Sequence, residues 1–93
     1  MADTIPDVAI DKTWKNVADP NNLGVPTPAI FTVQNKSYGN ILIAIGPEPS
    51  AASTDGFVLR QFEHLDIAGE TQVWVRSFST SVQTGEVHVG EIA

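Results

Sequence analysis

The chain has 93 residues, enough for one small domain, and it lacks cysteine, so disulfides, cysteine-based zinc sites and cysteine nucleophiles are excluded. Its 11 acidic and 5 basic side chains give a formal net charge of −6, whereas nucleic-acid binding needs a basic surface. The longest apolar run, residues 41–45, is far shorter than the roughly 20 residues of a membrane-spanning helix. We therefore expect neither nucleic acid nor a membrane among the partners.

Small size also bears on assembly. A domain of this length buries only about 60% of the surface of its unfolded chain, and without disulfides oligomerisation is the common remaining source of stability. We therefore expect a homo-oligomer. The first seven residues carry acids but no lysine or arginine, which is unlike a signal peptide, and a lack of cysteine is typical of proteins made in the cytoplasm.

The N-terminal third contains few regular patterns. Residues 1–12 are polar and include Pro6, so we expect an extended or disordered N-terminal arm, followed by a single domain over residues 13–93. Residues 13–18 predict a short strand. Residues 19–28 hold three prolines, a glycine and two asparagines, a density of breakers that predicts a loop without a helix.

The clearest local pattern begins at residue 29. In residues 29–34 the side chains alternate with a period of two, so that Phe31 and Val33 share one face. Residues 41–45 are apolar on both faces, as expected of a strand inside a core. Because the segment between these two runs is rich in turn-forming residues, the pattern predicts a β-hairpin.

The rest of the chain predicts further short strands. A second loop, rich in proline and small residues, spans residues 46–56, and strands are predicted at residues 57–60, 64–67, 72–78 and 86–92. About seven short strands without a helix are typical of an all-β fold, here a small antiparallel β-sandwich or barrel. The expected core residues are Phe31, Val33, Ile41, Ile43, Ile45, Leu59, Leu65, Ile67, Val73, Val75, Val87 and Val89.

No group of side chains predicts catalysis, a cofactor or a metal. His64 and His88 have acids nearby in the sequence, but no two potential ligands share a metal-binding spacing, and His88 falls on the exposed side of its strand. No serine has the strained-turn context of a hydrolase nucleophile, and no glycine cluster forms a phosphate-binding motif. We therefore expect a protein that is not an enzyme.

The candidate partner-binding residues are the large or flexible groups that remain after the core is assigned. They are Trp74, Arg76, Pro49, Ser50, Ile5 and Pro6. Tryptophan and arginine are enriched at the energetic centres of protein interfaces, which favours Trp74 and Arg76, and the other four lie in the long loop and the N-terminal arm. The alternative interpretation of Trp14 and Trp74 is that both are anchors of the core.

Several short motifs follow one another along residues 14–89. They are Trp-Lys-Asn-Val at 14–17, Gln-Asn-Lys at 34–36, the apolar strand 41–45, Pro-Ser at 49–50, Gly-Phe-Val-Leu at 56–59, Val-Trp-Val-Arg at 73–76 and Gly-Glu-Val-His-Val at 85–89. This order resembles a group of small tailed-bacteriophage virion proteins that have a β-sandwich. Each motif marks a strand or a turn rather than a reacting group. Such proteins often have a glycine-rich turn where this chain has Gln-Phe-Glu-His at 61–64.

The resemblance implies a structural protein of the virion, most concretely a capsid decoration or cement protein that binds the outer capsid surface and stabilises subunit junctions. Its partners would be the major capsid protein or other virion proteins. One alternative is a tail, head-fibre or head–tail connector component of the same kind of particle. Another is a carbohydrate-binding β-sandwich module, in which exposed Trp14, Tyr38 or Trp74 stacks on sugar rings.

Overall fold

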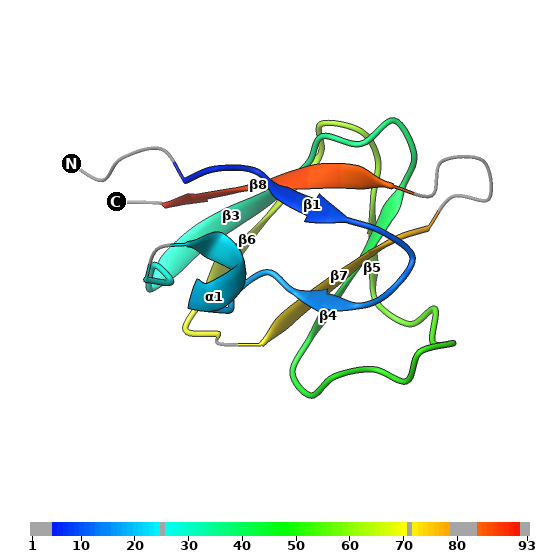
Figure 1. Cartoon of the computed structure of the whole chain (residues 1–93), viewed down its shortest axis with the longest axis horizontal. Coiled ribbons are helices and arrows are strands. Elements are labelled where there is room, and N and C mark those ends of the chain that lie inside the picture. Colours follow the sequence, from blue (N-terminus) through cyan, green and yellow to red (C-terminus); the bar gives the residue numbers. More distant parts are fainter. Residues whose placement is uncertain (1–4, 25, 71, 79–83, 92–93) are drawn as a thin grey trace.

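The computed structural model describes residues 5–24, 26–70, 72–78 and 84–91 and confirms the all-β class, with two antiparallel four-stranded sheets (Figure 1). The elements are β1 (Val8–Ile10), β2 (Lys15–Asn16), α1 (Pro20–Leu23), β3 (Ile30–Asn35), β4 (Ile41–Ile45), β5 (Phe57–Leu59), β6 (His64–Ala68), β7 (Val73–Ser77) and β8 (Gly85–Glu91). Within the described residues there is no helix with the length and apolar character that crossing a membrane requires.

Sheet A has the order β1-β8-β3-β6, and sheet B has the order β2-β7-β4-β5. This is the strand order of a jelly roll, a sandwich of eight strands built from two Greek keys. Among the described strands, only β4 and β5 are consecutive in the chain and neighbours in one sheet. In Figure 1, β8 lies between β1 and β3 in the upper layer, and β4 and β7 lie in the layer below. Strands from opposite ends of the chain are therefore direct neighbours.

The predicted β-hairpin of residues 29–34 and 41–45 is wrong. β3 pairs with β6 and β8 in sheet A, whereas β4 pairs with β5 and β7 in sheet B. The connection from β3 to β4 therefore passes from sheet A to sheet B, and we call it the crossing. Asn35, at its start, is fully buried, and its Oδ1 accepts a hydrogen bond from the Ser37 amide at 2.8 Å. Its Nδ2 donates to the carbonyls of Gly39 and Leu59 at 2.9 and 3.0 Å. Because Leu59 belongs to sheet B, this buried amide ties the end of β3 to the other sheet and stabilises the crossing.

The core lies between the two sheets. Every predicted core residue belongs to its buried cluster except Ile45, which is 41% exposed, and Leu65, which packs against the cluster while partly buried. The cluster also contains residues that the alternation does not predict, namely Ile5, Val8, Ile10, Val17, Ala18 and Leu23. All six come from the N-terminal third, where the elements are too short to show a period.

The described part of the expected N-terminal arm is extended and paired within the domain. Val8–Ile10 form β1 and pair with β8, with Val8 opposite Val87 in the register. Ile5 is only 6% exposed and contributes to the core. β1 is therefore an edge strand of sheet A, and the residue Ile5 ahead of it is part of the core. Residues 1–4, and Ile92 of the last predicted strand, lie outside the described residues.

The prediction that residues 19–28 contain no helix is wrong, because α1 forms one helical turn there. Asp19 caps the turn and accepts a hydrogen bond from the Asn21 amide at 2.9 Å. Pro20 occupies the first turn, where its missing N–H would have no helical partner, and Gly24 ends the helix with a left-handed φ of 75°. The positions of these breakers, rather than their number, decide the local structure.

Candidate interaction surface

The two sheets present different outer faces. In β7, Val73 and Val75 are buried in the core, so the alternation places Trp74 and Arg76 on the outer face of sheet B. In sheet A, Gln34 and His88 stand opposite each other in the register and lie on its outer face for the same reason. The outer face of sheet B therefore carries Trp74 and Arg76 on β7, whereas that of sheet A carries Gln34 and His88 on its two central strands.

Trp74 and Arg76 hold the connection between β4 and β5, residues 46–56, which we call the anchored loop. Trp74 Nε1 donates a hydrogen bond to the Gly46 carbonyl at 2.9 Å. Arg76 Nη1 donates to the carbonyls of Ala51 and Ser53, each at 3.2 Å. Both side chains are half-buried. The two residues predicted to contact a partner thus bind a loop of their own chain.

Arg76, which holds the anchored loop, also has Leu42 and Trp14 as neighbours. Leu42 stands opposite Arg76 in the register and is only 1% exposed. It does not belong to the core cluster, whereas its neighbours in β4, Ile41 and Ile43, do. The guanidinium carbon of Arg76 lies 5.8 Å from the ring centroid of Trp14, within the range of a cation–π contact. Trp14 Nε1 is buried and has no hydrogen-bond partner among the described residues. Arg76 therefore contacts both Trp14 and the anchored loop.

An open hollow of about 490 Å³ lies between the anchored loop and the ends of β4 and β5, and we call it the loop hollow. Ile45, Pro49, Ser50 and Phe57 are among its lining residues. Ile45 is the expected core residue that is exposed, and here it forms part of the wall. The loop hollow is lined by apolar side chains together with Ser50, Ser53 and Asp55, and Trp74 and Arg76 hold the loop that forms one side of it.

The edge strand β5 exposes Val58 at 47% as well as Phe57, which is 56% exposed and also lines the loop hollow, and we call these two side chains the apolar edge. Sequence patterns identify this segment as a strand but give no sign that it lies at a sheet edge. Since only the pairing of strands decides which one is outermost, these residues could not be recognised as surface groups beforehand.

The structure brings four of the predicted partner-binding residues to one region. Trp74, Arg76, Pro49 and Ser50 all belong to the anchored loop or hold it. The other two lie ahead of β1 at the edge of sheet A, where Pro6 is exposed and Ile5 is buried. A contact through Ile5 would require this segment to leave the core.

The outer face of sheet A carries a small polar cluster around Asp7. Its carboxylate accepts a hydrogen bond from Lys36 Nζ and lies 2.7 Å from His88 Nδ1. The hydrogen bond from Lys36, together with His88, holds the pKa of Asp7 below its usual value, although partial burial opposes this. The same bond raises the pKa of Lys36. The cluster ties the residue before β1 to β8 and to the end of β3.

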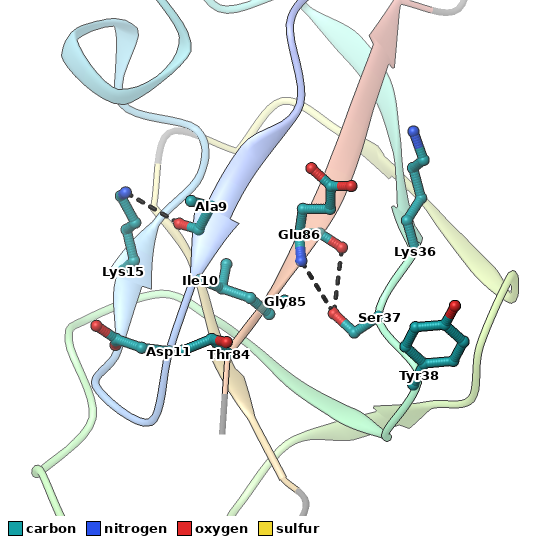
Figure 2. Close-up of a pocket in the computed structure, with 10 residues that line it drawn as sticks. All are labelled: Ala9, Ile10, Asp11, Lys15, Lys36, Ser37, Tyr38, Thr84, Gly85 and Glu86. Atoms are coloured by element: carbon teal, nitrogen blue, oxygen red, sulfur yellow. Dashed lines mark hydrogen bonds between the residues drawn. The ribbon is translucent and has the colours of Figure 1, made fainter. Parts of the chain in front are cut away.

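A second open hollow, of about 620 Å³, lies near the ends of β1 and β8 (Figure 2). Its polar groups largely bond within the chain: Lys15 Nζ donates to the Ala9 carbonyl at 3.0 Å. Ser37 Oγ accepts from the Glu86 amide at 3.1 Å and donates to the Glu86 carbonyl at 3.2 Å. Tyr38 stands on one side of the hollow and is 87% exposed, which leaves its ring accessible to a ligand.

The histidines do not form part of a metal site in the described ranges, where no three His, Asp or Glu side chains gather as ligands. His64 Nε2 lies 4.0 Å from Asp66 Oδ1, with both side chains well exposed. His88 lies on the outer side of its strand as predicted, but its contact with Asp7 leaves it only 29% exposed.

Comparison with known proteins adds no relative from which a function could be transferred. No protein-family model matches the chain, and no curated protein or solved structure matches it either. The function must therefore be argued from the fold and the surfaces described above.

Proposed function

We propose that the chain is a structural protein of a bacteriophage virion, a capsid decoration protein that binds the outer capsid surface and stabilises the junctions between subunits. The observation that carries this proposal is the jelly-roll order of the eight strands, an architecture found in viral capsid domains. It agrees with the resemblance of residues 14–89 to small tailed-phage virion proteins that have a β-sandwich. The major capsid protein is the proposed partner.

The loop hollow supplies a suitable contact surface. Exposed apolar patches on small domains often mark sites of interaction, and here Ile45 and Phe57 are exposed together beside Pro49 and Ser50. The hydrogen bonds from Arg76 to the anchored loop order it before any partner binds. A surface that is already ordered loses less conformational entropy on binding, which favours a stable contact.

Particles purified from the source that encodes the chain provide the first test, with gold-labelled antibody against the protein. Label spread over the head would support a decoration protein. Label confined to the tail or to a vertex would favour the alternative of a tail, head-fibre or connector component. Particles without label would contradict a role in the virion.

The contribution of the loop hollow is tested with capsids that lack this protein. Ile45→Ser should weaken capsid binding at least about tenfold, because it removes an apolar wall of the hollow. The matched control is Ile30→Ser, since Ile30 is similarly exposed but lies on the outer face of sheet A. Equal binding by the two variants would show that capsids contact another surface.

The exposed ring of Tyr38 beside the second hollow favours carbohydrate binding as a second candidate function, because aromatic rings stack on the apolar faces of sugars. A glycan array distinguishes the two functions. Binding that is lost in Tyr38→Ser and kept in Ile45→Ser would support a carbohydrate-binding module instead of a capsid protein.

A further inference from the structure

The edge strand β5 is less protected than the other sheet edges. Natural edge strands avoid unwanted pairing by carrying charges or by exposing little apolar surface. β2 contains Lys15, β6 contains Asp66, and β1 exposes only Ala9 between its two buried residues. By contrast, β5 contains no charged residue, and its Phe57 and Val58 are 56% and 47% exposed.

These two side chains point to opposite sides of the strand. Phe57 stands opposite Ile43, which belongs to the core, and Val58 stands opposite Leu42 on the outer face. A ligand that lies on one face of sheet B can cover only one of them. A strand added along the edge would flank both, and it would also extend the backbone hydrogen bonding of the sheet.

The charges at the two ends of β5 indicate which strand fits. Asp55 precedes the strand and Arg60 follows it, with no charged residue between them. Neither side chain forms an ion pair within the described part of the chain. Suppose that a second copy of β5 lies antiparallel to the first, with the two-fold axis passing at Phe57 or at Val58. Arg60 of one copy then stands opposite residue 54 or residue 56 of the other, so that Asp55 of the other copy is one position away. A parallel copy would instead bring like charges together.

We propose that two copies of this chain associate through their β5 strands in an antiparallel, two-fold arrangement. The two sheets B then form one continuous sheet, the apolar edge is covered on both faces, and the opposite charges of Asp55 and of Arg60 of the other copy lie near each other at each end. The arrangement is self-complementary, as a two-fold interface requires. This inference does not rest on the virion role, because the dimer forms in solution without a capsid.

Sedimentation equilibrium of the whole chain, up to roughly millimolar concentration, tests the dimer. The wild-type protein should show a monomer–dimer equilibrium, and Val58→Lys should weaken it at least about tenfold by placing a charge on the edge. The control is Ile30→Lys, the same kind of change at a side chain with the same 47% exposure but on a central strand, and it should dimerise as the wild type does. A wild-type protein that stays monomeric, or equal effects of the two variants, would overturn the proposal.

Charge reversal tests the antiparallel orientation. Asp55→Arg and Arg60→Asp should each weaken the dimer several-fold, because each places like charges at both ends of the interface. The double variant restores opposite charges and should recover most of the wild-type affinity. A double variant that associates no better than either single one would overturn this arrangement. Circular dichroism of each variant confirms that it is folded.

Discussion

The outer face of sheet A remains open to solvent, whereas the chain's own loop is fastened to the outer face of sheet B. On sheet A, Asp7 and His88 are polar groups that can stay partly hydrated while they bond to each other, so they need no cover. On sheet B, Leu42 stands opposite Arg76 on the outer face, and Trp74 and Arg76 on the same face hold the anchored loop. In this molecule the outward side chains of β7 therefore hold a neighbouring connection, whereas Asp7 and His88 on sheet A bond to each other.

The largest expected loss of stability comes from a substitution at Gly56, where the anchored loop leads back into β5. Gly56 has a φ of 137°, and a Cβ atom there would lie 2.5 Å from the Ile43 carbonyl oxygen. Gly56→Ala should therefore lower the free energy of unfolding by about 2–4 kcal/mol, measured by urea denaturation. Gly46→Ala, in the same loop, is strained at φ 111° but meets no atom, so about 1–2 kcal/mol is expected. If both variants lost the same free energy of unfolding, backbone strain alone would explain why residue 56 must be glycine.

The two tryptophans beside Arg76 provide a finer comparison. Trp74→Phe removes the hydrogen bond to Gly46 and should cost about 1–2 kcal/mol of unfolding free energy. Trp14→Phe removes a buried N–H that has no partner among the described residues, which favours the folded state, but it also replaces the indole with a smaller ring. Because the two effects oppose each other, we expect the free energy of unfolding to change by no more than about 1 kcal/mol. Faster proteolysis within residues 46–56 should accompany only Trp74→Phe. A larger loss of stability in Trp14→Phe would contradict this assignment of the two side chains.

The smallest effect is expected on the polar face of sheet A. Asp7→Asn removes the carboxylate that Lys36 and His88 contact and should cost at most about 1 kcal/mol at neutral pH, because the pair is partly exposed and screened. The folded state lowers the pKa of Asp7 from 3.8, so its contribution is complete above that value and disappears as the pH falls through the lowered pKa. Unfolding curves of the two proteins should therefore converge in acid. A difference that stayed constant with pH would point to a cause other than charge, and Glu70→Gln serves as the exposed control.

Much of the sandwich could be predicted because burial in strands alternates with a period of two. That pattern identified Phe31, Val33, Val73 and Val75 correctly as core residues. It could not reveal β1, since a strand of three residues shows almost no period. The crossing at Asn35 was missed for a different reason: a polar turn between two strands suits a hairpin as well as a crossing, and the bond from Asn35 to Leu59 joins residues 24 positions apart.

Residue type and local alternation were sufficient to predict the all-β class and most of the core. The tertiary structure alone decided which sheet each strand joins, that β5 lies at an edge, and that Trp74 and Arg76 hold residues 46–56. Strand pairing depends on hydrogen bonds and packing between segments far apart in the chain, and local patterns contain no information about these partners. For this reason the apolar edge and the loop hollow became visible only in the folded molecule.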